Sequence, residues 1–323
     1  MEEIKKSVKI DRSTLLNIIS MSIAAISIII AIIALVIAGA SSGGNTDGLK
    51  FYPDGHGDYI VAAGEAKYLS KIVIPSTYNG GKVVAIEDEG FSNCYQLTSI
   101  EIPDSVVTIG NYAFEGCIAL KTVSIGKGVT DIGSYAFSNC SELVTINIPE
   151  GVVTLDEYIF ANCEKLTNVY IPESISFIGD YAFEACEAIK YNVYENGYYL
   201  GNEGNPYHTL ISSDNTEITS FAINPATKIV YTKAFYYCTR LETIEFPAKV
   251  THIGSEAFYY CTKLNNIIIP ASVKTIAARA FYYCDSLSTV YYTGTEAQLG
   301  AIAIDYYNDP FIEAIIYTDY VAE

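Results

Sequence analysis

The sequence contains few of the side chains and short motifs from which catalytic centres are commonly built. Only three histidines occur among 323 residues, and they lie in three different segments as His56, His208 and His252. The chain has no H-E-x-x-H or C-x-x-C motif and no phosphate-binding glycine loop. Its G-x-S-x-G match, at residues 39–43, lies in a Gly- and Ser-rich stretch rather than between a predicted strand and helix, so the commonest metal, nucleophile, thiol and nucleotide sites are not indicated. We therefore expect a protein that is not an enzyme and uses no cofactor.

Basic residues are scarce as well. The chain has 19 Lys and Arg residues against 37 Asp and Glu residues, which gives a formal charge of −18. The first 40 residues hold four basic and three acidic side chains, a net charge of +1, so the remainder carries −19. A surface this acidic repels nucleic acid and anionic lipid headgroups, and we expect no nucleic-acid partner.

The abundant carboxylates do not form a pattern that indicates chemistry. They are scattered over positions expected to face solvent, which does not suggest the paired carboxylates of a glycosidase. The alternate residues Asp54, His56 and Asp58 could contact a cation, but a hairpin turn explains the same spacing. We predict no metal site.

What the sequence does contain is one pattern with a period of 23 residues. Residues 97–117 show it clearly as LTSIEIPDSVVTIGNYAFEGC. A fixed period of this length predicts a stack of repeats in which neighbouring copies share one core. We count ten copies by their first apolar residue: Leu69, Leu97, Leu120, Leu143, Leu166, Ile189, Ile218, Leu241, Leu264 and Leu287.

Each copy divides into three parts. The part L-x-x-I-x-I places its last two apolar residues two apart, the side-chain period of a strand, and Pro or Gly then ends that strand. The part V-x-x-I-G follows, and we expect its glycine, such as Gly133, to supply a turn with positive φ. The part A-F-x-x-C predicts a short helical or 3₁₀ turn whose Ala, Phe and Cys point inward. Stacked copies would form a parallel β-sheet on one face of a solenoid and these turns on the other.

In this L-x-x-I-x-I-P…I-G-x-x-A-F-x-x-C frame the chain resembles the BspA-type leucine-rich repeat proteins of bacterial and protozoan cell surfaces, over about Leu49 to Tyr317. The resemblance implies a repeat solenoid of the leucine-rich repeat class and adhesion to proteins of host or neighbouring cells, without catalysis. The frame has Pro or Gly where the common leucine-rich pattern has Asn. The ligands of animal and plant leucine-rich receptors are therefore not implied.

The apolar run at residues 15–38 predicts a transmembrane signal-anchor helix. As a helix it would span ~36 Å, enough for a bilayer core of ~30 Å. Basic residues precede it, so we expect residues 1–14 to be a cytoplasmic tail and the repeats to be extracellular, in a single-pass protein of the cell membrane. A cleaved signal peptide is the alternative, because Ala38-Gly39-Ala40 resembles a cleavage site, but the run is longer than signal peptides usually have.

The rest of the chain divides by composition and by the repeat. Residues 39–48 are a flexible linker by composition, and residues 49–68 predict a hairpin that caps the first coil. The solenoid is expected over 69–292, with an irregular insertion at 189–217 that is either a functional loop or a tolerated insertion. A C-terminal cap is expected over 293–323, with a short helix near 296–302 and a last strand at 314–317.

Two surfaces are candidates for binding. On the outward face of the strands, Tyr170, Glu245 and Tyr291 are the expected anchors, although Ser, Thr and Asn in these columns also suit a solvated sheet. The second candidate consists of tyrosine pairs that precede the Cys of three later copies, and tyrosine is enriched at contact surfaces. A ladder that stacks for its own stability is the alternative interpretation. These tyrosines are Tyr236, Tyr237, Tyr259, Tyr260, Tyr282 and Tyr283.

The eight cysteines all occupy the same inward repeat position, and we predict a structural ladder of reduced thiols. They fall into a run of five and a run of three, so pairing between neighbours would leave one unpaired in each run. One thiol per coil in a straight line also cannot make a tetrahedral metal site. The ladder consists of Cys94, Cys117, Cys140, Cys163, Cys186, Cys238, Cys261 and Cys284.

Together these features predict a membrane-anchored surface protein that mediates adhesion or recognition. The expected partner is an extracellular protein or glycan, and a second copy of the chain is a further candidate. The alternative is a structural surface spacer without a specific ligand.

Overall fold

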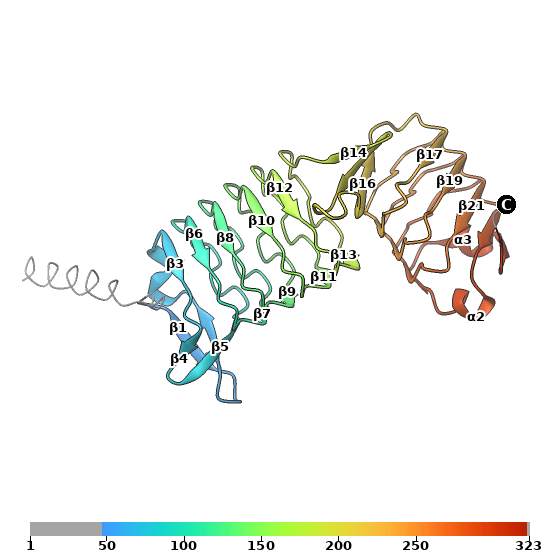
Figure 1. Cartoon of the computed structure of the whole chain (residues 1–323). Helices are drawn as coiled ribbons and strands as arrows, with labels where there is room; N and C mark the ends of the chain where they lie inside the picture. The colour runs from blue at the N-terminus through green and yellow to red at the C-terminus, as the bar shows by residue number, and fades with distance from the viewer. Residues whose placement is uncertain (1–46, 322–323) are drawn as a thin grey trace, which may run out of the picture. The chain divides into compact units, whose positions relative to one another are not determined.

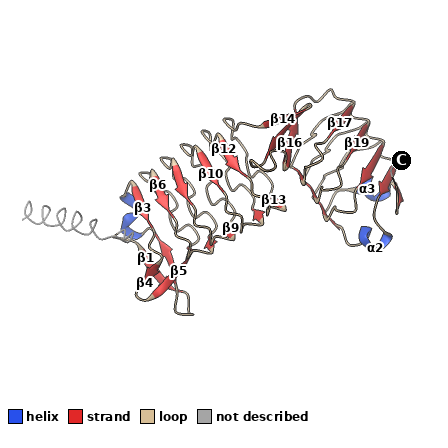
Figure 2. Ribbon diagram, in the orientation of Figure 1, coloured by secondary structure: helices blue, strands red, loops and turns tan. Residues whose placement is uncertain are grey.

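The computed structural model describes residues 47–321, and there the repeats stack as successive coils of a β-solenoid (Figures 1 and 2). The predicted cytoplasmic tail, the membrane helix at 15–38 and most of the linker lie outside the described residues. Among residues 47–321, none of the helices has the length and apolar character that crossing a membrane requires.

The strands of the L-x-x-I-x-I segments pair in parallel with the predicted register. Ser99, for example, lies between Lys71 and Thr122, and Asn266 lies between Thr243 and Thr289. They form two five-stranded sheets rather than one. The first contains β3 (Lys71–Val73), β6 (Ser99–Glu101), β8 (Thr122–Ser124), β10 (Thr145–Asn147) and β12 (Asn168–Tyr170). The second contains β17 (Ser220–Ala222), β19 (Thr243–Glu245), β21 (Asn266–Ile269), β23 (Thr289–Tyr292) and β25 (Ile315–Tyr317).

A further set of short parallel strands, which the sequence analysis did not predict, forms at the V-x-x-I-G segments. In the first half these are β5 (Gly81–Ile86), β7 (Thr108–Ile109), β9 (Asp131–Ile132), β11 (Thr154–Leu155) and β13 (Phe177–Ile178). In the second half they are β18 (Ile229–Val230), β20 (His252–Ile253) and β22 (Thr275–Ile276). The same sheet continues into β16 (Thr209–Ser213) of the insertion and β24 (Ala303–Ile304) of the C-terminal cap. Each coil therefore contributes two strands, separated by turns.

The glycine of the I-G pair does not adopt the positive φ that we expected. Positive φ values occur at six glycines of the described chain, and Gly110 and Gly133 are not among them. A Cβ on Gly133 would lie 2.7 Å from the backbone nitrogen of Asn111 in the preceding coil, and one on Gly110 would lie 2.6 Å from that of Asp88. Glycine is used at these positions because the neighbouring backbone approaches so closely.

The A-F-x-x-C segments form hydrogen-bonded turns, and the prediction of short helical or 3₁₀ turns was wrong. The residue before each segment and the residue before its Cys have positive φ, such as Tyr112 at 56° and Gly116 at 69°, and these interrupt any helix. The resulting geometry turns N–H groups toward the next coil. The N–H of Tyr112 donates to Ser134 O at 2.9 Å, and that of Phe114 donates to Ala136 O at 2.8 Å.

The core lies between the strands and these turns and consists of columns of identical residues. Phe91, Phe114 and Phe137 are fully buried, and their rings stack with centroids 5.1–5.3 Å apart. All eight cysteines are buried as well. In six coils the Cys Sγ donates to the carbonyl oxygen of the Phe in the preceding coil, at 3.0–3.3 Å.

Short elements cover the two ends of the solenoid. At the N-terminal end, β1 (Lys50–Pro53) and β2 (Tyr59–Ala62) form an antiparallel hairpin, followed by the 3₁₀ helix η1 (Gly64–Tyr68) and by β4 (Thr77–Tyr78), which pairs with β5. At the C-terminal end, α2 (Glu296–Leu299) and α3 (Asp309–Glu313) precede β25. A capping box between Thr295 and Gln298 begins α2.

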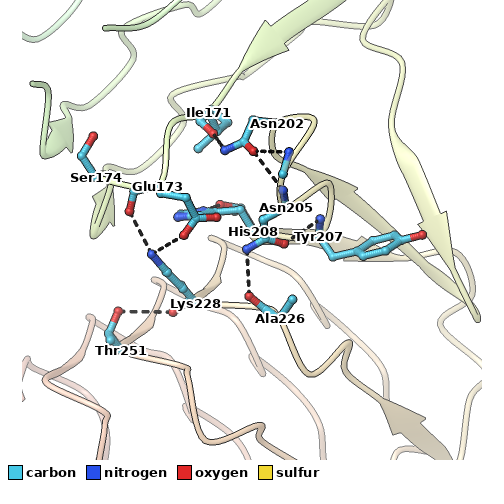
Figure 3. A network of polar contacts seen from close by, with 12 residues as sticks. Ile171, Glu173, Ser174, Asn202, Asn205, Tyr207, His208, Ala226, Lys228 and Thr251 are labelled. Atoms are coloured by element: carbon cyan, nitrogen blue, oxygen red, sulfur yellow. Dashed lines mark hydrogen bonds and ion pairs between the residues drawn. The ribbon is translucent and has the colours of Figure 1, made fainter. Parts of the chain in front are cut away.

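The insertion at 189–217 interrupts the stack. We counted Ile189 as the start of a regular strand, but β14 (Asn192–Tyr194) and β15 (Gly197–Leu200) instead form an antiparallel meander with β16. The buried apolar residues form two clusters that meet at the insertion, and Ile229 and Tyr231, which follow it, belong to the first cluster. Polar contacts cross the interruption (Figure 3): Lys228 Nζ lies 2.6 Å from Glu173 Oε2, and Asn202 Nδ2 donates to Ile171 O at 2.8 Å.

Candidate binding surfaces

The structure brings the six predicted tyrosines together on the turn face of three successive coils, here called the tyrosine surface. The rings form two rows, in which the first two rings stack and the third, Tyr282 or Tyr283, is tilted by 47° or 41°. Tyr236 and Tyr259 have centroids 5.1 Å apart, and Tyr237 and Tyr260 have centroids 4.9 Å apart with planes 4° from parallel. The tyrosine surface consists of Tyr236, Tyr237, Tyr259, Tyr260, Tyr282 and Tyr283.

Three of these tyrosines occupy a backbone conformation that large residues rarely adopt. Tyr237, Tyr260 and Tyr283 have φ values of 60°, 62° and 58°. A side chain with a Cβ in this region costs on the order of 1 kcal/mol, and Asn and Gly tolerate it best. The equivalent first-half positions carry mostly those residues, such as Asn93 and Gly116. The second half therefore retains tyrosine where the backbone disfavours it.

The tyrosine surface extends into the C-terminal cap, which the repeat pattern did not reveal. Tyr306 and Tyr307 are 61% and 50% exposed, and the ring of Tyr307 lies 5.7 Å from that of Tyr282. The guanidinium of Arg279 stacks over Tyr307 at 5.1 Å. These residues follow the last Cys of the repeat, so the 23-residue spacing gave no signal for them.

A second tyrosine column was missed although the sequence contains its signal. Tyr112, Tyr135, Tyr158 and Tyr181 recur five positions before each Cys, and neighbouring rings stack with centroids 4.8–5.0 Å apart. Desolvation by the neighbouring side chains, together with the charges of nearby phenols and carboxylates, raises the pKa of Tyr135 and of Tyr158. The column covers the turn face of the first half as the tyrosine surface covers that of the second.

Charged residues continue this column past the insertion. The ammonium of Lys233 lies 4.7 Å from the ring centroid of Tyr181, and Glu256 bridges Lys233 and Arg279 at 3.8 and 3.5 Å. Burial alone would lower the pKa of Lys233, but the neighbouring Tyr181 and Glu256 raise it. The positive charges here are thus already paired within the chain.

On the sheet face, the structure unites two of the three predicted anchors. Glu245 on β19 and Tyr291 on β23 line one hollow of about 410 Å³. Tyr170 lies on β12 in the other sheet, where its hydroxyl donates to Glu150 Oε1 at 3.2 Å. The three residues therefore do not form a single site.

The hollow on the second sheet, here called the sheet groove, owes its shape to two features. In the register of the sheet, the small Ala222 lies beside Glu245, which lies beside Ile268, and Ala222 leaves the floor open. At the far end, the backbone N–H of Tyr320 donates to Tyr292 O at 3.1 Å, which holds the Tyr320 ring 4.6 Å from that of Tyr291 as a wall. The sheet groove is lined by Ser220, Thr243, Glu245, Asn266, Ile268, Tyr291 and Tyr320, over Phe221, Ala222 and Ile244.

The three histidines and their neighbours do not assemble a metal centre. Among residues 47–321, the structure shows no cluster of three His, Cys, Asp or Glu side chains able to hold a metal ion. Asp54 Oδ1 accepts the backbone N–H groups of His56 and Asp58 at 2.8 and 3.0 Å, which lowers the pKa of Asp54 and closes the hairpin turn. His208 and His252 are buried in the second half.

Comparison with solved structures finds bacterial repeat proteins of low identity. A leucine-rich cell surface protein from Faecalibacterium prausnitzii A2-165 is 23% identical, with 82% of this chain and 98% of that chain covered and a TM-score of 0.36. A leucine-rich repeat protein from Bacteroides ovatus is 24% identical, with 81% and 90% covered and a TM-score of 0.33. The pneumococcal vaccine antigen PcpA is 16% identical, with 87% and 88% covered and a TM-score of 0.41.

Comparison of the sequence with protein-family models identifies the family more directly than the solved structures do. No curated protein matches the sequence. The family model of the BspA type leucine rich repeat region matches in six copies, over residues 66–204 and 213–315. These ranges cover well over half of the chain and contain the frame of strands, turns and buried cysteines described above. The chain therefore belongs to the BspA-type leucine-rich repeat family.

Proposed function

We propose that the chain is a recognition protein of the cell surface that binds an extracellular protein or glycan through the tyrosine surface. In this proposal, residues 15–38 anchor it in the membrane and the solenoid faces outward. Family membership supports the repeat scaffold, and the partner is inferred from the chemistry of the surface. Tyrosine rings supply rigid contact area at little entropic cost, and their hydroxyls tolerate water.

One observation carries the proposal. At the position directly before Cys, three successive coils have a positive-φ tyrosine, Tyr237, Tyr260 and Tyr283, where the first half mostly has Asn or Gly. The positive-φ tyrosines of the first half lie five positions before Cys and serve as the control below. Backbone strain of this kind tends to be kept where a side chain has a function. Tyr237 is also 45% exposed, so its ring is available to a partner.

A structural spacer without a ligand is the second candidate. It is favoured by the stacking of the rings on one another, since the stack itself contributes stability. Interplanar angles of 13° between Tyr236 and Tyr259 and 4° between Tyr237 and Tyr260 are those of well-formed stacks. The two candidate functions predict different changes in binding and in thermal stability when the stacked tyrosines are replaced.

The test replaces the tyrosine surface with the Ser-Asn pairs that the chain already uses at Ser138 and Asn139. Saturable binding of the full-length chain to host or neighbouring cells and to immobilised glycans is measured beside thermal unfolding. If the tyrosine surface binds a partner, we expect the affinity to fall ~10-fold or more, because tyrosines that become buried in an interface are frequent hot spots. The thermal midpoint should change little, because relief of the backbone strain offsets the lost stacking.

The matched control replaces Tyr112, Tyr135 and Tyr158 with Ser, which removes a stacked column on the first half. This control should keep its binding. The variant that lacks all six tyrosines could instead show a much lower thermal midpoint while its folded fraction still binds. That result would contradict recognition through the tyrosine surface and support the structural spacer. Loss of self-association alone would identify a second copy of the chain as the partner.

A further inference from the structure

The sheet groove carries a negative charge that its own lining does not balance. Its lining contains one carboxylate, Glu245, and no Lys, Arg or His side chain. Among the described residues, the Glu245 side chain has no ion pair and no hydrogen bond. The nearest pocket along the sheet, of about 440 Å³, shares Glu245 and Ala222 with the groove and ends at Lys249.

The aromatic wall of the groove adds to the same preference. The rings of Tyr291 and Tyr320 lie 4.6 Å apart, inclined by 38°, at the end of the groove. Tyr317 stacks behind Tyr291 with centroids 5.7 Å apart and planes 16° from parallel. Aromatic faces carry negative electrostatic potential and attract ammonium and guanidinium groups. A carboxylate and two tyrosine side chains that line one hollow therefore favour a cation.

The remaining lining fits the rest of a long basic side chain. Ile268 and Ala222, above the buried Phe221 and Ile244, offer an apolar floor for the methylene groups of Arg or Lys. The side-chain oxygens of Thr243 and Asn266 can accept N–H groups that the carboxylate does not reach. Guanidinium suits this set best, because it is planar, stacks on aromatic rings and donates in several directions.

We propose that the sheet groove binds an arginine side chain presented by an extended segment of a protein partner, and lysine more weakly. The proposal rests on the proposed function in taking that partner to be extracellular, and it commits to a protein at this site. The formal charge of −18 would increase the rate of encounter with such a basic segment.

The test uses the full-length chain with labelled isoleucine δ1 methyl groups, because Ile268 lies within the groove and reports on it directly. Two blocked tripeptides are titrated, Gly-Arg-Gly and Gly-citrulline-Gly, which differ in charge but hardly in shape. We expect the Ile268 signal to shift on addition of the arginine peptide, with the citrulline peptide ~10-fold weaker because the ion pair and the cation–π contact are lost. Added salt should weaken the arginine peptide only.

The variant Glu245→Gln should abolish the discrimination between the two peptides. Glu101→Gln is the matched control, because Glu101 is exposed at the same strand position on β6 of the first sheet. The control should leave the discrimination intact. Both variants keep the size of the side chain, so a folding defect is not expected to obscure the result.

Equal binding of the two peptides, binding of neither, or an equal effect of the two variants would overturn the proposal. A shift of Ile268 with neutral oligosaccharides but not with the arginine peptide would also overturn it and would assign the groove to a glycan. These results are independent of the proposed function, because cell binding that is lost with the tyrosine surface would still stand.

Discussion

At the scale of single residues, two buried histidines make the solenoid sensitive to acid. His208 and His252 are 0% and 2% exposed, and neither His208 Nε2 nor His252 Nδ1 has a hydrogen-bond partner among the described residues. The ring of His252 lies edge-on to Phe177, with centroids 4.8 Å apart. Burial lowers the pKa of each histidine to about 4. Both are therefore neutral in the folded protein near pH 7.

We expect stability to fall as the pH decreases from 6.5 toward 4. In this window the unfolded chain takes up protons on both histidines, while the folded chain does not. The loss should be about 2 kcal/mol per histidine by pH 5. Urea unfolding at pH 7.5 and pH 5 measures it, and His252→Leu should reduce the difference by about that amount. His56→Ser is the control, because His56 is exposed in the hairpin turn; a similar reduction there would contradict the assignment.

The cysteine ladder gives a second prediction at this scale. The thiols are buried, and burial raises the pKa of Cys140 to about 12. We expect the native protein to react negligibly with a thiol reagent at pH 8, and the protein unfolded without reductant to give close to eight thiols. Four or fewer would mean that neighbouring coils are linked by disulfides.

At the scale of elements, each coil is stabilised by the side chains of the coils next to it. Phe137 is fully buried and stacks on Phe114 and Phe160, with centroids 5.1 and 5.7 Å apart. It belongs to the apolar cluster of the first half, whereas Phe258 belongs to that of the second. The two clusters meet at the insertion at 189–217, which contributes Leu200 to the first and Leu210 to the second. A stack of repeats transmits a local defect mainly to adjacent coils.

Phe137→Ala and Phe258→Ala form a matched pair that tests this division. Each removes a buried ring and should cost about 3–5 kcal/mol. Native-state hydrogen exchange should show lost protection mainly in the half that contains the substitution, because coils open in contiguous groups. Loss of protection throughout the chain in both variants would show instead that the solenoid unfolds as one unit.

At the scale of the whole molecule, both candidate surfaces belong to the second half. The tyrosine surface covers its turns, and the sheet groove lies on its strands. The insertion separates these coils from the first half, where the tyrosine column is formed by Tyr112, Tyr135, Tyr158 and Tyr181. The half of the chain that contains the second apolar cluster thus also contains both candidate surfaces. A partner that binds there need not contact the first half.

The sequence by itself determined the repeat, the register of the strands and the inward columns. Alternation of apolar residues fixes which face of a strand is buried, and equal spacing fixes which residues become neighbours. That is why Ser99 lies between Lys71 and Thr122 as predicted, and why the six tyrosines of the tyrosine surface lie together.

Only the tertiary structure decided the features that arise between coils. The close approach of Asn111 to Gly133, the positive φ of Tyr112 and the second set of strands all follow from hydrogen bonds to a neighbouring coil. The sheet groove needs Tyr320 to return over β23, and this return is held by backbone hydrogen bonds from Asp319 to Gly294 and from Tyr320 to Tyr292. Such contacts join residues that no local pattern relates, so they become visible only when the coils are stacked.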